Sequence, residues 1–170
     1  DSQEFLRGFD ENDNLMYGTD ESESDVDDLL VTRALATVEV YSPKTNSWRS
    51  CTPMSQPRIG AFAGFVGGSL VVAGGSGYLY EDGDGDRLTS AEVYTGNGWA
   101  PLPPMPHLAH LATACVLNGR LYVMGGTYSN KLQVLEMIEE NGLSWSCKAE
   151  LPAERWAAAS VVHEGRIWVM

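Results

Sequence analysis

The stretch Ser69–Gly75, Ser-Leu-Val-Val-Ala-Gly-Gly, sets the pattern of this chain. It recurs at 120–126 as Arg-Leu-Tyr-Val-Met-Gly-Gly, and residues 166–170 repeat its first part as Arg-Ile-Trp-Val-Met. A short apolar run with β-branched and aromatic residues, ended by glycine, predicts a buried strand rather than a helix. The two glycines let the backbone leave the strand at positive φ and let a neighbouring segment approach closely. The stretch therefore predicts a repeated β structure.

The repeat has a measurable length. Gly74 and Gly125 are 51 residues apart, as are Trp48 and Trp99, while Trp99 and Trp145 are 46 residues apart. Landmarks that shift together mark an internal repeat, and a period of about 40 to 50 residues is typical of propeller blades. Each copy contains two strands before the Gly-Gly exit, a variable loop, a strand that ends near Tyr and a strand near Trp.

This pattern resembles the kelch repeat over about residues 36–170. The resemblance is carried by paired glycines, tyrosines and tryptophans at repeat-equivalent positions, which are Gly74, Gly75, Gly125, Gly126, Tyr41, Tyr94, Trp48, Trp99 and Trp145. It implies an all-β chain, a kelch β-propeller fragment with four-stranded antiparallel blades. We expect a half blade at 36–55, whole blades at 56–106 and 107–152, and the start of another blade at 153–170. Because propellers close with about four to eight blades, we expect the natural protein to continue on both sides.

Acidic residues are concentrated in the first 35 residues. The net charge of the chain is −12, and residues 1–35 contain 11 acidic and 2 basic side chains. The run Asp20–Asp28 repels itself and offers little to bury, so we expect residues 1–35 to form a disordered, low-complexity segment or an insertion between two strands. Neither part of the chain has a basic stripe, which argues against a nucleic-acid partner.

Cysteine usage and hydropathy favour a cytoplasmic (intracellular) protein. Cys51, Cys115 and Cys147 lie in predicted strands without paired metal-ligand spacing, so we expect buried, reduced thiols. No apolar run is long enough to cross a membrane, so we expect no membrane partner. The chain begins at Asp1 and not at Met, which suggests a fragment whose targeting cannot be judged.

The sequence contains no convincing catalytic or metal motif. Residues 82–86, Asp-Gly-Asp-Gly-Asp, resemble the start of a calcium-binding EF-hand loop. Such a loop would need Gly at its sixth position and Glu at its twelfth, where this chain has Arg87 and Val93. His107, His110 and His163 form no ligand cluster in sequence. We therefore predict no enzyme activity, no metal and no small-molecule cofactor.

The loops at one end of the propeller carry our candidate partner-binding residues. In kelch proteins that recruit substrates, an arginine just before the inner strand can face the pocket, and a guanidinium recognises carboxylates in a two-pronged geometry. Arginine and tyrosine are favoured interface anchors. The predicted set is Arg58, Ser76, Tyr78, Tyr80, His107, Thr127, Tyr128 and Arg155. The alternative for Arg58 and Arg155 is that they only hold loops in place.

Two functions follow from the resemblance. The first is a protein-interaction module, as in BTB–kelch proteins, which present substrates to cullin–RING ubiquitin ligases. The second is a galactose-oxidase-like or sugar-isomerising propeller enzyme. The fold does not decide between them. We favour the first, with a protein partner, for which the resemblance implies a ubiquitination substrate.

Overall fold

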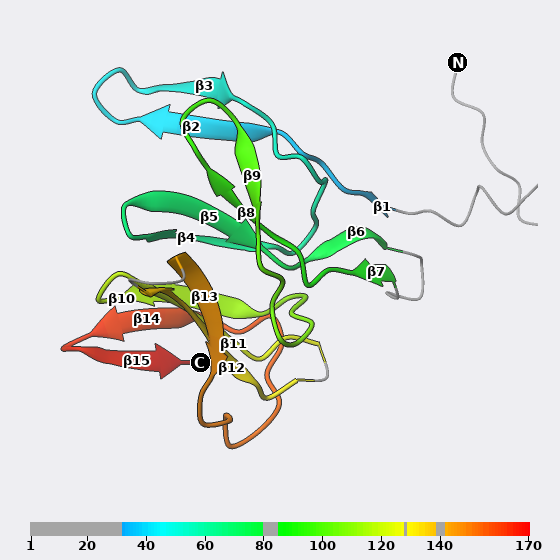
Figure 1. The fold of residues 1–170 in the computed structure, drawn as a ribbon, viewed down its shortest axis with the longest axis vertical. Helices are drawn as coiled ribbons and strands as arrows, with labels where there is room; N and C mark the ends of the chain where they lie inside the picture. Colours follow the sequence, from blue (N-terminus) through cyan, green and yellow to red (C-terminus); the bar gives the residue numbers. More distant parts are fainter. Residues whose placement is uncertain (1–31, 80–84, 128, 139–141) are drawn as a thin grey trace, which may run out of the picture.

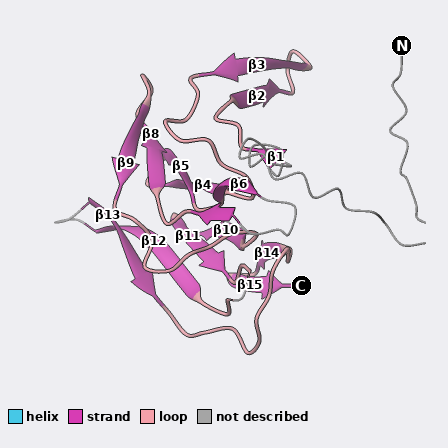
Figure 2. Cartoon of the chain, turned by 90° about the vertical axis from the view of Figure 1, so that its right-hand side faces the viewer, coloured by secondary structure: helices cyan, strands magenta, loops and turns pink. Residues whose placement is uncertain are grey.

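The chain is described here by a computed structural model, which describes residues 32–79, 85–127, 129–138 and 142–170. All the regular secondary structure in these residues is β-strand (Figures 1 and 2). The described part of the chain accordingly has no helix long and apolar enough to cross a membrane. The predicted disorder of the acidic segment concerns residues that lie mostly outside this description.

Two four-stranded antiparallel sheets form the centre of the molecule. The first has the order β4 (Phe62–Val66), β5 (Ser69–Ala73), β8 (Ala91–Tyr94) and β9 (Trp99–Leu102). The second has the order β10 (Thr113–Leu117), β11 (Arg120–Met124), β12 (Leu132–Ile138) and β13 (Gly142–Cys147). Two hairpins flank them, β2 (Val38–Ser42) with β3 (Ser47–Cys51), and β14 (Ser160–His163) with β15 (Arg166–Val169). The sheets follow one another from blue to red in Figure 1 as successive blades, which confirms the predicted fold class.

The hairpin turns explain how the inner strands reverse. Asn118 and Gly119, between β10 and β11, have φ values of 51° and 72°, and Gly67 and Gly68, between β4 and β5, have 59° and 83°. Positive φ at both central residues defines the type I′ turn, whose twist matches that of the flanking strands. The turn sequences therefore fix the register of the inner strands, such as Leu117 opposite Arg120.

The Gly-Gly pairs join each blade to the next one. The amide of Gly75 donates to the carbonyl of Ala109 at 2.9 Å, and the amide of Gly126 donates to the carbonyl of Arg155 at 2.7 Å. Gly125 has a φ of 72°, and a Cβ there would lie 2.2 Å from the carbonyl oxygen of Arg155. Glycine is required at this position both by the backbone conformation and by the close approach of the next blade.

The core lies between the inner strands of the two central blades. Val66, Val71, Leu121, Val123 and Leu135 are fully buried. Where β4 crosses the neighbouring blade, a Cβ on Gly64 would lie 2.7 Å from Val116 and 2.8 Å from Leu121. The small residue on the inner strand therefore allows the blades to pack closely.

The segment 76–89 differs from its prediction. We expected it to be the variable loop that follows Gly-Gly, but β6 (Ser76–Leu79) and β7 (Gly85–Arg87) form a hairpin, and β1 (Thr32–Arg33) pairs with β6 to give a third strand. Thr32 lies opposite Leu79. This sheet could not be predicted because the segment has no alternating apolar pattern. Its pairing is carried by the backbone, and β1 joins β6 from more than 40 residues away in the sequence.

The cysteines agree only partly with expectation. All three are free, but Cys147 is exposed because it ends β13, the outermost strand of its blade, and Cys51 and Cys115 are only half-buried. Burial raises the pKa of the Cys115 thiol. The prediction of buried thiols was therefore wrong for Cys147.

The repeated tryptophans are contacts between blades. The indole N–H of Trp99 donates to the carbonyl of Thr52 at 2.9 Å, and that of Trp145 donates to the carbonyl of Pro103 at 3.0 Å. Each acceptor lies four residues after the tryptophan of the preceding repeat, Trp48 or Trp99. Trp99 and Trp145 are half-buried, whereas Trp48 is 69% exposed. Burial at this repeat position is therefore partial in two copies and absent in the first.

Replacing Trp99 with alanine is expected to destabilise the chain by about 2 kcal/mol, less than for a fully buried tryptophan. The loss combines its packing area with the hydrogen bond to the neighbouring blade. Urea denaturation of the 170-residue chain measures it. Trp48→Ala is the matched control at the exposed copy and should cost about 0.5 kcal/mol or less. Equal losses in the two variants would contradict the contact between blades.

Candidate functional site

The loops expected to bind a partner are 55–58, 76–89, 106–109, 127–130 and 152–155. Their described residues, together with the adjoining Lys131, lie at one end of the blades, which we call the loop end. In Figure 1 the turns β2–β3, β4–β5 and β10–β11 lie on the left, and the β6–β7 hairpin lies at the opposite end. At the loop end, the chain leaves β5 and β11 through their Gly-Gly pairs.

Arg58 is a buried residue of this end. Its side chain is fully buried and pairs with Glu92 of β8, with Nη2 3.0 Å from Oε1. Its Nη1 donates to the carbonyls of Gly74 and Ser90 at 3.0 and 2.9 Å, and Nη2 also donates to the hydroxyl of Ser90. The acidic group opposite this guanidinium thus belongs to the chain itself, and we leave Arg58 out of the surface proposed below.

Glu92 connects Arg58 to the preceding loop. The amide of Ser55 donates to Oε2 of Glu92 at 2.9 Å, and the Ser55 hydroxyl also donates to this oxygen. Burial alone would raise the pKa of Glu92, but the hydrogen bonds from Ser55 and the charge of Arg58 outweigh it and hold the pKa below its usual value. Glu92 therefore stays ionised inside the fold.

The next blade uses a neutral version of the same arrangement. Gln133 of β12 lies opposite Val123, as Glu92 lies opposite Val72, and it is 1% exposed. Its side chain accepts from the amide of His107 at 2.9 Å and donates to the carbonyl of His107 at 3.1 Å. The position equivalent to Arg58, 51 residues on, is Ala109. Where the arginine is absent, the carboxylate is also absent.

This pair predicts how stability depends on acid. The folded pKa of Glu92 is lowered, so its ionisation stabilises the fold above the unfolded-state pKa, about 4.3, and this stability is lost as pH falls through the folded value. Below about pH 4.3 the wild type should lose stability more steeply than Glu92→Gln. Urea denaturation between pH 7 and 3 measures this difference. Parallel curves for the two proteins would contradict it.

Ser76 and the tyrosines differ in their accessibility. Ser76 is fully buried, and its hydroxyl donates to the carbonyl of Tyr78 at 2.5 Å or that of Asp86 at 2.9 Å. It therefore holds the β6–β7 hairpin and offers nothing to a partner. Tyr78 is half-buried in β6. Tyr80 and Tyr128 lie outside the described residues.

His107 and Thr127 come together at a cavity of about 470 Å³. Its walls come from the end of β7, the segment 106–110 and the segment 127–131, so two consecutive blades form it. The described residues that line it are Arg87, Thr89, Pro106, His107, Leu108, His110, Thr127, Ser129 and Lys131. Of these, His107 and Thr127 were predicted as site residues, and the other seven, which include Arg87, His110 and Lys131, were not.

Arg155 lies in the following blade and is exposed. Its carbonyl accepts the hydrogen bond from Gly126, while its side chain lines a shallower cavity of about 280 Å³ together with Trp156 and Met170. Arg155 and the larger cavity are therefore both at the loop end but do not share one pocket.

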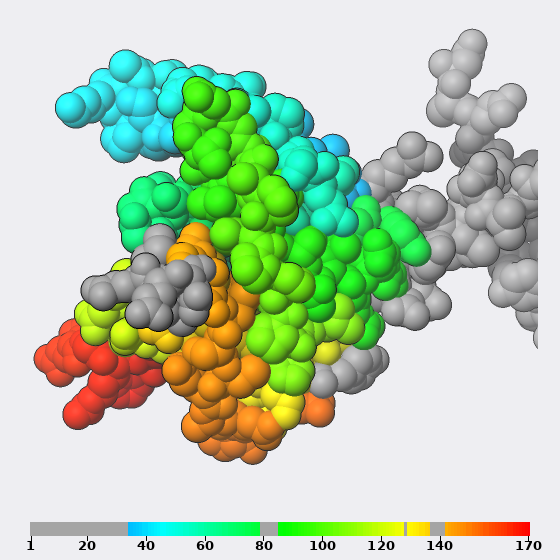
Figure 3. All heavy atoms as spheres, viewed as in Figure 1, coloured from blue at the N-terminus to red at the C-terminus, as the bar shows by residue number. Residues whose placement is uncertain are grey.

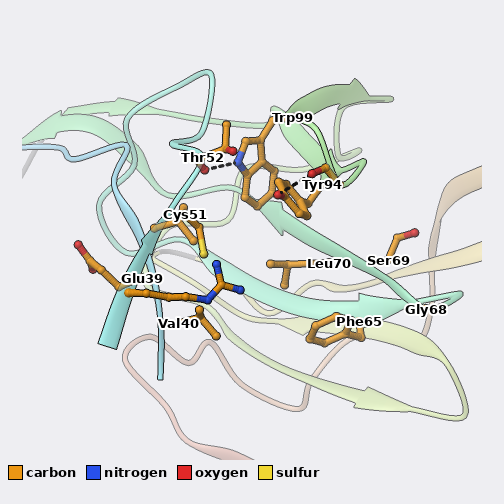
Figure 4. A pocket seen from close by; sticks show the side chains of 13 residues that line it. Glu39, Val40, Cys51, Thr52, Phe65, Gly68, Ser69, Leu70, Tyr94 and Trp99 are labelled. Atoms are coloured by element: carbon orange, nitrogen blue, oxygen red, sulfur yellow. Dashed lines mark hydrogen bonds between the residues drawn. The ribbon is translucent and has the colours of Figure 1, made fainter. Parts of the chain in front are cut away.

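A second, more apolar groove lies between the β2–β3 hairpin and the first four-stranded blade. It measures about 550 Å³ and includes Phe65, Leu70 and Trp99 in its walls (Figure 4). Phe65 is 61% exposed. Figure 3 shows the hairpin, in blue and cyan, set off from the green blade below it. Just after the hairpin, Thr52 and Ser55 bond to Trp99 and Glu92 of the first blade.

Metal ligands do not gather anywhere in the described part of the chain, where no three His, Cys, Asp or Glu side chains lie close enough to hold an ion. The signal that could have found the cavity residues is weak. Arg87 is the one base in an otherwise acidic segment 81–87, and His110 stands at the repeat position that Ile59 and Trp156 occupy in the other copies.

The comparisons with known proteins agree with the geometry. A family model described as the kelch motif matches residues 18–55 and 109–152. Kelch-like protein 35 of Mus musculus is 25% identical over 138 residues, covering 81% of this chain and 23% of its own length. An F-box/kelch-repeat protein of Arabidopsis thaliana is 32% identical over 117 residues, covering 66% of this chain and 27% of its own length. The chain thus spans about a quarter of the length of these relatives.

A solved structure, that of YjhT, has a similar fold, with a TM-score of 0.63 and 14% identity over 77% of this chain and 48% of that one. At this identity the likeness concerns the fold alone. The kelch motif matches, the named relatives and the Gly-Gly, Tyr and Trp positions of the blades lead to one conclusion: the chain belongs to the kelch-repeat family.

Proposed function

We propose that the loop end binds a segment of a partner protein and that the chain acts as a recognition module without catalytic activity. The observation that carries this proposal is the cavity lined by Arg87, His107 and Lys131, which come from the end of β7 and from two separate loops. Loops on a rigid sheet scaffold are the usual place for binding residues. The relatives, which are kelch-like and F-box/kelch-repeat proteins, support an interaction role.

The surface that we propose contains His107, Leu108 and Thr127 around the cavity and Arg155 beside it. Tyr78 lies at its margin in β6. Leu108 is 48% exposed, and such an apolar side chain beside cations can anchor a peptide while the charges orient it. Arg58 and Ser76 support this surface from inside.

By resemblance to BTB–kelch proteins, we further propose that the partner is a substrate of a cullin–RING ubiquitin ligase, for which the whole protein would serve as adaptor in the cytoplasm. If so, depleting the whole protein from cells should raise the level of the partner and lower its ubiquitination. An unchanged level and ubiquitination would reject the adaptor role and leave the binding surface untouched.

The binding surface is tested by site-specific photo-crosslinking. The photoreactive amino acid p-benzoylphenylalanine replaces Leu108, and in a control protein it replaces Glu164, which is exposed in the β14–β15 turn at the other end. We expect one protein, identified by mass spectrometry, to crosslink at position 108 and not at 164. Competition by the unlabelled chain should remove the crosslink. The same proteins at both positions would reject the loop end as the binding surface.

A further inference from the structure

The two flanking hairpins are complementary halves of one blade. In each whole blade the second strand pairs with the third, which is β5 with β8 and β11 with β12. Hairpin β14–β15 corresponds to the first and second strands of a blade, and β2–β3 corresponds to the third and fourth. Among the described residues each hairpin is a sheet of two strands, so β15 and β2 each have one unpaired edge. The two hairpins lie at opposite ends of the row of sheets (Figure 1).

The apolar side chains on these two edges are more exposed than their counterparts in the whole blades. Met170 is 68% exposed, whereas Met124, at the same repeat position in β11, is 2% exposed. Val40 of β2 is exposed, whereas Val134, at the same position in β12, is fully buried. Exposed apolar side chains along an unpaired strand edge favour pairing with a further strand.

Arg155 stands beside β14 where Arg58 stands beside β4. Gly60 and Ala157, each two residues after the arginine, have positive φ values of 62° and 50°. The amide of each arginine donates to a carbonyl in the segment before the third strand of the preceding blade. The two arginines therefore occupy equivalent places, although Arg58 is buried in a whole blade and Arg155 is exposed beside a half blade.

Glu39 of β2 is likewise the counterpart of Glu92 in β8. Each lies two residues before the tyrosine that faces the repeated tryptophan of its sheet. Thr37 stands where Ser90 does, and the hydroxyl of Ser90 accepts a hydrogen bond from Arg58 Nη2 at 2.9 Å. The β2–β3 half blade thus carries both the carboxylate and the hydroxyl that hold the arginine in the whole blade.

The chain therefore contains the two members of a third arginine–glutamate pair on different hairpins. Arg155 and Glu39 are both exposed, and neither forms an ion pair among the described residues. In the second whole blade the arginine and the carboxylate are absent together, since Ala109 and Gln133 stand there. Their joint presence on the two half blades is the charge complementarity that one composite blade would need.

We propose that a second copy of this chain completes both half blades, with β15 of one copy paired to β2 of the other and Arg155 of one copy paired to Glu39 of the other. The register of the whole blades places Met170 opposite Val38 and Val169 opposite Glu39. Each copy uses both of its edges, so two copies related by a two-fold axis form a closed ring.

The resulting number of blades suits a propeller. Two copies contain four whole blades, and their four half blades make two composite ones, which gives six blades in all. Propellers close with about four to eight blades. The chain also spans 48% of the solved chain of YjhT, so two copies supply about the length of one chain of that fold. The sequence predicted that residues on both sides would complete the ring, and a second copy supplies the same strands.

Closing the ring changes the loop end at Arg155. In the ring this side chain is buried as Arg58 is, and it supports the loop end from inside. The cavity at His107 and Thr127 lies between two whole blades of one copy. The partner-binding surface around that cavity therefore does not depend on the second copy, and a crosslink at position 108 tests it separately.

The test is analytical ultracentrifugation of the 170-residue chain over a range of concentrations. We expect a species of twice 18.5 kDa that dissociates on dilution. Glu39→Arg alone, or Arg155→Glu alone, brings like charges together in both composite blades, so each should raise the Kd of the dimer about a hundredfold or more. Glu164→Arg makes the same change of charge in the exposed β14–β15 turn and should leave the Kd unchanged.

Mixing the two single variants identifies what fills the half blades. A dimer of one Glu39→Arg copy and one Arg155→Glu copy again has opposite charges in both composite blades, so the mixture should dimerise as the wild type does. The double variant should dimerise by itself. Circular dichroism reports folding of each variant, and Glu39→Lys or Arg155→Asp, which carry the same reversals, replaces one that does not fold.

A wild-type chain that stays monomeric would reject the second copy and favour strands from elsewhere in the same polypeptide. Folded single variants that do not dimerise when mixed would reject the pairing of Arg155 with Glu39. Assemblies of more than two copies would reject the closed ring. An equal loss of dimer in Glu164→Arg would show that any charge reversal acts on assembly, and would also overturn the proposed interface.

Discussion

Arg58→Ala is expected to destabilise the chain by about 3 to 5 kcal/mol, the cost of leaving a buried charge without its partner. The guanidinium is fully buried and Glu92 is 3% exposed, so water cannot replace the lost contacts. Two backbone carbonyls, of Gly74 and Ser90, also lose a donor. Urea denaturation at pH 7 measures the loss.

The neighbouring blade supplies the matched control. Arg58→Ala combined with Glu92→Gln recreates the pairing of Ala109 with Gln133, in which no charge is buried. We expect the double variant to recover about half of the lost stability or more, because the remaining glutamine can bond the loop backbone as Gln133 does. A double variant that is less stable than Arg58→Ala, or a single variant that loses under about 1 kcal/mol, would contradict the buried-pair account.

Gly125→Ala is the second change with a large expected effect, about 3 kcal/mol or more. The added Cβ costs about 1 to 2 kcal/mol at positive φ and would also lie 2.2 Å from the carbonyl oxygen of Arg155. Something must therefore move at the junction of two blades. Thermal and urea unfolding of the 170-residue chain measure the combined cost.

Gly119→Ala separates the two contributions. Gly119 has the same φ, 72°, but a Cβ there would meet nothing within 4 Å. It should therefore cost only the backbone strain, about 1 to 2 kcal/mol. If the two variants lose the same stability, the close approach of the blades at Gly125 contributes nothing.

The blades could be predicted from the sequence because their strands have local signals. Gly-Gly and Asn-Gly mark strand ends within one or two residues, as at β5 and β11, which end at Ala73 and Met124 directly before their Gly-Gly pairs. The β1–β6–β7 sheet could not be predicted, because its pairing depends on contacts between the backbones of distant segments rather than on side-chain pattern.

The candidate site was harder to predict. Spacing placed Arg58 next to the inner strand but could not tell whether its side chain points to solvent or into the blade. One useful signal was present: Arg58 and Glu92 of one repeat are both replaced in the next repeat, by Ala109 and Gln133. This signal can be recognised only once the strand register shows that Glu92 and Gln133 occupy equivalent positions. His110 carried no sequence signal beyond its position, because its distinctive feature is that neither ring nitrogen has a hydrogen-bond partner among the described residues.

The junctions at the Gly-Gly pairs explain why the loop end can diversify. Both junctions use the carbonyl of the residue before the inner strand, which is Ala109 in one blade and Arg155 in the next. A main-chain oxygen is the same for every amino acid, so this connection does not depend on side-chain identity. Positions at the rim can therefore drift in evolution, and acquire new specificity, without loosening one blade from another.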